Sequence, residues 1–430
     1  MTNELERTER ERAIRLTLNV HKARNRKGVM TLLLSLMMST SLLPTVFGSP
    51  ATMTVLAQQP PINFVRTIQI TPDSEFLTGS FARINYVPAT DHFVVSFGTK
   101  AGTEPNTSLG AGYAYKEYNL DMQEVGRTGI LEWYPNASEA GDSGSFMINS
   151  TYYHVFVSQK MGDPYGWHII KYDAANWTRV KELYVTLKDP NDGNLDPCVA
   201  YINGQLDVSD QYNPTGIWQE GNWTRHHLFT ADLEPLGNIT LDDSPHISGS
   251  SMIFVEGVYY LVSANFYSGD LTVLKYDSDW NFLGNKTLIP RAHWPQGVAF
   301  DGARFYVAYL DTSKRNGSAF FPVYPNVHLA VFDRNWNLLH DAAITSFAYG
   351  GDKKGGRPWV TLHGNLLYVS YDVDTVNVTT QEEEKKWQGY VSIFEISEVT
   401  QEESWPWLTL SVGIFVVVVL SVAYKLLKGD

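Results

Sequence analysis

The feature that most restricts the fold of this chain is a pattern that recurs six times. Each copy is an apolar strand that ends in Tyr or Phe, followed by Asp or Asn, a short turn that often contains Trp-Asn, an apolar residue and Gly. The clearest copy runs from Tyr276 to Gly284. The copies begin at Tyr118, Tyr172, Phe229, Tyr276, Phe332 and Phe394, at intervals of 54, 57, 47, 56 and 62 residues. A self-similar period of this length indicates a repeat architecture.

A second element keeps the same rhythm, and it is a tight turn followed by an alternating, often aromatic strand. It occurs at residues 91–95, 151–155, 204–208, 257–261, 302–307 and 364–369. Each repeat therefore consists of strand, tight turn, strand, variable loop, strand, tight turn and strand. No stretch between residues 60 and 400 keeps a helical period. The pattern predicts an all-β, six-bladed β-propeller over residues 62–397, with five or seven blades as the alternatives.

The two ends of the repeat region predict how the ring closes. The sixth copy begins at Phe394 and is cut short, so the last unit lacks its fourth strand. Phe64–Ile70 reads as a strand that belongs to no unit of its own. We expect this strand to complete the last blade, because pairing the two ends removes two open sheet edges.

The N-terminal segment, residues 1–57, has the order of a secretory signal. Eight Lys or Arg residues precede an apolar run, Met30–Phe47, and small residues around Val55-Leu56-Ala57 offer a cleavage site. A membrane span is the alternative for this run. Because the basic region is unusually long, we expect translation to begin near Val29 or Met30.

The C-terminal segment predicts a membrane anchor. Residues 404–424 are 21 residues without a charge, and a helix of that length spans about 31 Å, which matches the ~30 Å bilayer core. A short acidic linker, residues 398–403, precedes it, and two lysines follow it in the tail 425–430. This asymmetry places the tail in the cytoplasm and the repeat domain outside a single-pass cell membrane.

The composition of the chain limits the kinds of partner and cofactor that it can bind. The net charge is −13 and both ends are basic, so the repeat domain is acidic, and a nucleic-acid partner is excluded because phosphates need Lys and Arg. Cys198 is the single cysteine, which excludes an internal disulfide and a cysteine-based zinc site. Nine Asn-x-Ser/Thr acceptor sites predict a glycoprotein. They are Asn106, Asn136, Asn149, Asn176, Asn222, Asn238, Asn285, Asn316 and Asn377.

One face of the propeller is expected to bind the ligand. The loops between the second and third strands are long, whereas the other turns within each repeat are tight. Long, variable loops on one face mark a binding surface. Exposed aromatic side chains are expected there, from Trp218 and Trp223 in one loop and Phe320, Phe321 and Tyr324 in another. They could stack on sugars or anchor a protein, or they could pack on neighbouring loops.

Cofactor motifs are sparse, and no cofactor is expected. The run Asp189–Asp196 is rich in oxygen ligands and could hold calcium, but it does not follow EF-hand spacing and also reads as an ordinary turn. The adjacent pair His226-His227 should point to opposite faces of a strand. No zinc-binding His spacing and no glycine-rich phosphate loop is present.

A short motif carries a resemblance to enzymes. Asp196-Pro197-Cys198-Val199 is similar to strand entries of the five-bladed furanosidase-type glycoside hydrolases, the arabinanase and invertase-like group. The resemblance implies two carboxylates on different blades, and Asp142 enters the preceding blade at the comparable place. Where the family has its general-acid Glu, this sequence has Asp243 followed by Ser244-Pro245-His246. Whether the chain is an enzyme stays open.

Polar residues from different blades are expected to meet at the central channel. The entries to the innermost strands converge there, and these residues lie at or near the entries: Asp142, Asp196, His246, His293 and Arg357. Trp294 and Trp359 could stack beside a bound sugar. Alternatively, the polar groups only cap the strand entries. The sequence thus predicts a membrane-anchored surface propeller that binds an extracellular glycan or protein; a polysaccharide hydrolase and a structural envelope protein are the alternatives.

Overall fold

The computed structural model describes residues of one compact unit, Pro60–Ser397. The described residues are 61–71, 80–100, 110–135, 137, 143–157, 166–186, 192–212, 223–241, 250–264, 269–313, 325–348, 351–379 and 387–397. Within these ranges no helix is long and apolar enough to cross a membrane. The expected signal segment 1–57 and the expected span 404–424 lie outside them.

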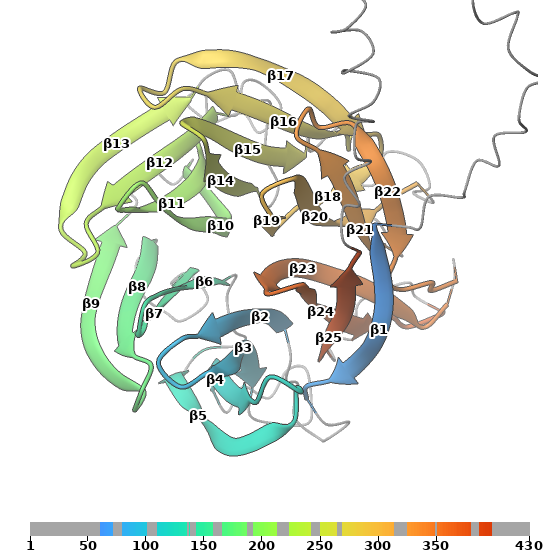
Figure 1. Cartoon of the computed structure of the whole chain (residues 1–430). Coiled ribbons are helices and arrows are strands. Elements are labelled where there is room, and N and C mark those ends of the chain that lie inside the picture. The colour runs from blue at the N-terminus through green and yellow to red at the C-terminus, as the bar shows by residue number, and fades with distance from the viewer. Residues whose placement is uncertain are drawn as a thin grey trace, which may run out of the picture. The chain divides into compact units, whose positions relative to one another are not determined.

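Six antiparallel sheets form a ring of blades around a central axis, which confirms the six-bladed β-propeller (Figure 1). Blade 1 consists of β2 (Ser80–Val87), β3 (His92–Lys100), β4 (Ala111–Tyr118) and β5 (Glu124–Tyr134). Blade 2 consists of β6 (Ser143–Ile148), β7 (Thr151–Val157), β8 (Gly166–Asp173) and β9 (Thr178–Thr186). Blade 3 consists of β10 (Asp192–Ile202), β11 (Gln205–Tyr212), β12 (Trp223–Phe229) and β13 (Pro235–Leu241). Blade 4 consists of β14 (Ser251–Val255), β15 (Val258–Ala264), β16 (Leu271–Tyr276) and β17 (Phe282–Ile289). Blade 5 consists of β18 (Ala292–His293), β19 (Val298–Phe300), β20 (Arg304–Asp311), β21 (Asn326–Asp333) and β22 (Leu338–Ala343), and its short strands β18 and β19 both pair with β20. Blade 6 is β23 (Lys353–His363), β24 (Leu366–Thr375), β25 (Gln388–Ile396) and β1 (Ile62–Gln69).

The ring closes through the N-terminal strand, as the sequence predicts. β1 pairs antiparallel with β25, from Ile62 opposite Ile396 to Gln69 opposite Tyr390. In Figure 1 the two ends of the colour range, blue and red, therefore meet in one blade. The outer edge of β25 is therefore paired with β1, and the first and the last strand of the domain belong to the same sheet.

In blades 1 to 5, the turn between the third and fourth strands is stabilised by its first residue. In blade 4, the Asp277 carboxylate accepts the backbone N–H groups of Asp279 and Asn281, both at 2.9 Å. Asp333 holds the blade 5 turn in the same way. These contacts satisfy backbone donors in a turn too tight to pair them with carbonyls, which explains why Asp and Asn recur there.

A tryptophan late in these turns, fourth in blade 4 and fifth in blade 2, packs between blades. Trp280 stacks on Tyr259 of its own blade at 4.3 Å between ring centroids and lies 4.8 Å from His226 of blade 3. Trp177 of blade 2 stacks on Tyr115 of blade 1 at 4.2 Å. The repeated aromatic residues are therefore interblade packing, as expected from the sequence.

Basic side chains tie neighbouring blades together at the same end of the ring. Each reaches a backbone carbonyl at the next turn or chain end around the ring, and the pairs are Arg66 to Asp121, Arg127 to Ala175, Lys181 to Asp232, Lys286 to Asn335 and Arg304 to Ser397. A long cationic side chain can satisfy an outward-facing carbonyl while its stem covers apolar surface.

The strand directions define two faces of the ring. The turn face carries the tight turns between strands 1 and 2 and between strands 3 and 4; the loop face carries the 2–3 loops and the connections between blades. His226 and His227 confirm the alternation predicted for this pair, because His226 contacts Trp280 of blade 4 and His227 contacts Trp167 of blade 2.

Candidate functional site

A buried arginine occupies the centre of the ring. Arg83 lies on β2, the innermost strand of blade 1, and is 1% exposed. Its Nε donates to the Ser143 carbonyl at 3.1 Å, one Nη donates to the Arg357 carbonyl at 3.0 Å, and the other donates to Gln296 Oε1 at 2.7 Å. One guanidinium thus joins blades 1, 2, 5 and 6. A planar donor fork suits this task, because it can bond several carbonyls in fixed directions.

A cavity of about 240 Å³ lies in the central channel, with Trp359 among its lining residues. The Arg83 guanidinium carbon is 5.2 Å from the centroid of the Trp359 ring. From that level the lining continues along the innermost strands β10, β14, β19 and β23 to Asn203, in the turn after β10. The cavity therefore extends from the level of Arg83 and Trp359 toward the turn face.

A second arginine lies nearer the loop face. Arg357 is on β23 and its side chain is 26% exposed. Its guanidinium carbon is 4.1 Å from the Phe81 ring centroid and 5.1 Å from that of Trp387. One Nη lies 3.3 Å from Asp372 Oδ2. Aromatic faces and a carboxylate thus orient a cation that retains contact with solvent.

Asp372 brings an acceptor to the same place. Its Oδ2 also accepts the backbone N–H of Phe81 at 2.9 Å. Its Oδ1 is buried and has no hydrogen-bond partner among the described residues. A Cβ added to Gly356 would lie 2.1 Å from that oxygen, so a larger residue there would displace the carboxylate. An unpaired buried carboxylate oxygen costs roughly 1–3 kcal/mol, which the fold bears to keep the carboxylate beside Arg357.

The entries to three innermost strands share an unusual backbone conformation. Phe81, Trp294 and Arg357 have φ of 54°, 47° and 42°, in the left-handed region that bulky residues rarely adopt. Register shifts flank Phe81 on β2 and Arg357 on β23. Each such residue costs on the order of 1–3 kcal/mol and is found disproportionately at functional sites. The bulges re-aim the two side chains so that they stack on each other.

The sequence-predicted site residues are partly brought together. Arg357 and Trp359 adjoin Arg83, and Trp294 follows the same backbone pattern in blade 5. His293 is buried at 2% exposure on β18, where it packs against Gly269 of blade 4. Asp142 and His246 lie outside the described residues, and only the backbone of Asp196 is described, in β10. The role of these three residues stays a prediction.

Sequence reasoning did not identify the partners of Arg357. The missed residues are Phe81, Arg83, Gln296, Asp372 and Trp387. One signal could have found Arg83: it lies four residues before the end of β2, where the corresponding positions of the other innermost strands are uncharged. X-Pro pairs at strand entries also recur, in Trp294-Pro295 and Arg357-Pro358.

His154 makes the domain sensitive to acid. It is fully buried on β7, and burial, with the positive charge of Arg83 as a smaller cause, lowers the pKa of His154 to about 3. In the unfolded chain a histidine titrates near 6.5, so below that pH the unfolded state binds a proton that the folded state does not. The stability that this group contributes is complete above pH 6.5 and is lost as the pH falls toward 3.

We therefore expect His154→Phe to flatten the pH dependence of unfolding. Between pH 6.5 and 4 the parent should lose up to about 1.4 kcal/mol per pH unit through this residue, and the variant should not. Denaturant unfolding at three pH values measures both slopes. Identical slopes would mean that His154 does not stay neutral in the folded domain.

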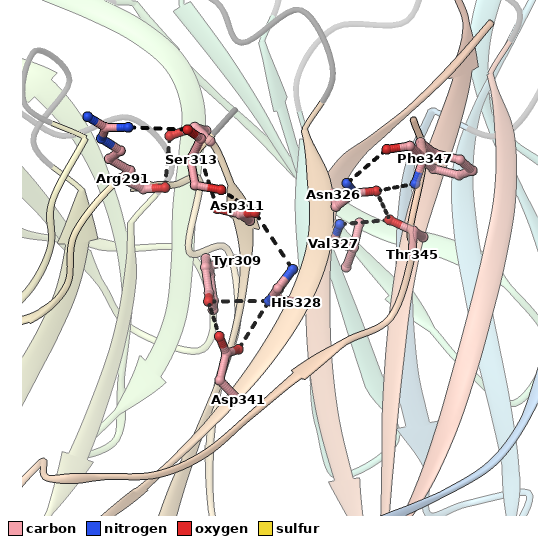
Figure 2. A network of polar contacts seen from close by, with 11 residues as sticks. Arg291, Tyr309, Asp311, Ser313, Asn326, Val327, His328, Asp341, Thr345 and Phe347 are labelled. Carbon is pink, nitrogen blue, oxygen red and sulfur yellow. Dashed lines mark hydrogen bonds and ion pairs between the residues drawn. The ribbon is translucent and has the colours of Figure 1, made fainter. Parts of the chain in front are cut away.

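A polar network organises the loop-face end of blade 5 (Figure 2). His328 Nδ1 lies 3.2 Å from Asp341 Oδ1, and the Tyr309 hydroxyl donates to the other oxygen of that carboxylate at 2.9 Å. Burial, and next the charge of Asp341, raises the pKa of the Tyr309 hydroxyl. His328 Nε2 is 3.9 Å from Asp311, whose carboxylate accepts the N–H and hydroxyl of Ser313. The network ties β20, β21 and β22 to the start of the blade 5 loop.

The remaining candidates for chemistry are the single cysteine and a metal site. Cys198 is buried, and desolvation raises the pKa of its thiol to about 12, so it does not form a nucleophilic thiolate at neutral pH. Among the described residues, no group of three or more His, Cys, Asp or Glu side chains could hold a metal ion. The side chains of Asp189–Asp196 lie outside them, so the calcium site there stays a prediction.

Comparison with known proteins finds likeness in structure only. No protein-family model matches the chain, and no curated protein matches its sequence. A subtype N10 neuraminidase-like protein of A/little yellow-shouldered bat/Guatemala/060/2010 aligns over 79% of this chain and 100% of its own, at 9% identity and a TM-score of 0.46. A neuraminidase-like protein from A/bat/Guatemala/164/2009 aligns over 80% and 97%, at 8% identity and a TM-score of 0.47. A chain of a nidogen/laminin complex aligns over 66% and 94%, at 12% identity and a TM-score of 0.40.

Proposed function

We propose that this chain is a membrane-anchored cell-surface propeller that binds an extracellular polar ligand, a glycan before a protein, at the loop-face end of its channel. The observation that carries the proposal is Arg357. Its guanidinium is held in a strained bulge between Phe81 and Trp387 and is still about one quarter exposed. Strain retained at a partly exposed cation is more readily explained by recognition than by packing.

The chemistry beside Arg357 supports a hydroxyl-bearing ligand. Arg357 supplies donors at a partly exposed position, and the buried Asp372 carboxylate 3.3 Å from one Nη holds its guanidinium in place. Neighbouring hydroxyl groups of a sugar ring can accept hydrogen bonds from this guanidinium, and the rings beside it can stack on the sugar. Convergent polar groups in a largely apolar setting are the usual form of a small-ligand site. The long 2–3 loops on the same face and the expected exterior location support the same reading.

The test is binding of the full-length chain, purified in detergent, to an array of neutral and acidic glycans. We expect Arg357→Ala to weaken binding by about tenfold or more, because a charged hydrogen bond to the ligand is lost. Arg334→Ala is the matched control: this arginine pairs with Glu256 on the turn face, and its loss should leave binding unchanged.

The outcomes are separable. Lost binding with an unchanged melting temperature supports the site. Normal binding by the Arg357→Ala variant would place the ligand elsewhere, and lower stability with intact binding would make Arg357 structural. Turnover of an arabinan or fructan would replace a binding function by a hydrolase.

A further inference from the structure

The outermost strand of every blade is a sheet edge, and in blades 2 to 6 it begins with a bulge that exposes an apolar side chain. Register shifts mark a bulge near the start of β1, β9, β13, β17 and β22. The extra residue at each bulge is aliphatic and about half exposed: Val65 50%, Val180 58%, Leu236 50%, Leu283 55% and Leu339 50%. These strands form the rim of the ring (Figure 1). Exposed apolar residues on an open edge favour edge-to-edge association.

Blades differ in what else protects the edge. β5 carries Glu124, Arg127 and Glu132, and β9 carries Arg179, Lys181 and Glu182. β13 has no charged residue, and β17, β22 and β1 have one each, which are Lys286, Asp341 and Arg66. All three are bonded within the protein. Charged side chains are the common protection of a natural sheet edge, and these four edges are short of it. Of the four strands, β13 and β17 are the two that contain an Asn-x-Thr acceptor.

The same five-residue motif occupies two of these charge-poor edges. It is Leu236-Gly237-Asn238-Ile239-Thr240 in β13 and Leu283-Gly284-Asn285-Lys286-Thr287 in β17. Gly237 and Gly284 have φ of 139° and 128°, which places both copies in the same bulge. Asn238 and Asn285 are exposed, and within the part of the chain that the structure describes neither side chain makes a hydrogen bond or ion pair.

We propose that Asn238 and Asn285 carry N-linked saccharides that cover the apolar bulges and shield the open edges of blades 3 and 4; this rests on the extracellular location in the proposed function. Asn-x-Thr is the acceptor sequence. The side-chain amide nitrogen attacks C1 of the sugar of a lipid-linked, pyrophosphate-activated saccharide. The C–N bond forms as the C1–O bond breaks, the lipid pyrophosphate leaves with the electron pair of that bond, and the amide proton passes to a base.

The structure distinguishes these two acceptors from Asn176. In the blade 2 turn, Asn176 Nδ2 donates to Asp173 Oδ2 at 3.0 Å, and its Oδ1 accepts the Thr178 N–H at 2.9 Å. The side-chain amide of Asn176 is therefore held by hydrogen bonds within its turn. The side-chain amides in β13 and β17 make no such hydrogen bonds, and each lies two residues beyond an exposed leucine. A bulky hydrophilic chain there prevents another strand from pairing with the edge.

The test uses the full-length chain from a eukaryotic secretory host. Peptide mass mapping should find saccharide at Asn238 and Asn285. The double variant Thr240→Val/Thr287→Val removes both acceptors and keeps both asparagines. We expect it to aggregate about threefold or more faster than the parent by light scattering. Thr151→Val, which removes the acceptor at Asn149 in a tight turn, is the matched control and should aggregate at the parental rate.

A second set of variants separates shielding from a loss of folding. Adding Leu236→Ser/Leu283→Ser to the double variant should restore the parental rate. Saccharide at Asn149 but not at Asn238 and Asn285 would overturn this inference, and so would occupied sites whose loss leaves the aggregation rate unchanged. No saccharide at any of the nine acceptors would instead count against the extracellular location, and the inference would fail with it.

Discussion

Deletion of residues 62–71 is expected to destroy the monomeric propeller. The deletion removes β1, whose pairing with β25 runs from Ile62 to Gln69. It also removes two buried anchors, Ile62 at 3% and Ile70 at 2% exposure. About eight backbone hydrogen bonds at ~1 kcal/mol each, with the buried apolar area, amount to a loss of order 10 kcal/mol. Whole domains are stable by about 5–15 kcal/mol, so the loss approaches the entire stability of the ring.

Size-exclusion chromatography with light scattering, together with a thermal melt, measures this effect. The deleted chain should form large species, because the largely buried strand β25 becomes the open edge in place of the mostly exposed β1. A synthetic peptide of residues 60–71 provides the control: added during refolding, it should restore a monodisperse species. A deleted chain that stays monomeric and melts at the parental temperature would show that closure by β1 does not hold the ring.

Arg83→Met is expected to destabilise the domain by about 3–5 kcal/mol, the range measured when a buried charged partner is removed from its network. The substitution roughly preserves volume but leaves Gln296 Oε1 and the carbonyls of Ser143 and Arg357 without their donor at the centre of the ring. Burying a cation is itself costly, so the predicted loss comes from the acceptors left unpaired rather than from the charge.

Denaturant unfolding of the full-length chain tests this prediction with a double-mutant cycle. Gln296→Leu alone should be destabilising, and in the Arg83→Met background it should cost clearly less, because the shared hydrogen bond is already absent. Arg83→Lys should fall between the parent and Arg83→Met, since one ammonium cannot replace a planar fork. Additive effects in the cycle, or an unchanged midpoint for Arg83→Met, would contradict a central role for this contact.

The repeat architecture was readable from local sequence. Tyr276-Asp277 and Phe332-Asp333 predict a strand followed by a tight turn, and in both turns the Asp side chain accepts the backbone N–H groups as expected. The stray strand Phe64–Ile70 predicts ring closure, and β1 confirms it. These features depend on neighbours in sequence or on one repeat counted against the next, so periodicity and turn chemistry suffice to predict them.

The two-residue alternation of side chains did not predict which residues are exposed where a strand contains a bulge. The repeated apolar residue before Gly, such as Leu283, belongs to the sequence pattern of a strand, and nothing in that pattern predicts that it is half exposed. The register shift between Lys275 and Tyr276 places an extra residue in β17 and interrupts the two-residue period. Two-residue periodicity assigns sides only in a regular ladder.

Of the candidate site, the sequence by itself determined that Arg357 and Trp359 enter an innermost strand. Only the tertiary structure decided what surrounds them. Arg83 and Gln296 are 213 residues apart in the chain and meet through one hydrogen bond. Phe81 reaches Asp372 across the junction where the first and last blades join. Such pairs leave no periodic pattern in the sequence. They depend on how neighbouring blades are oriented relative to each other and on the bulges that turn their side chains toward the axis of the ring.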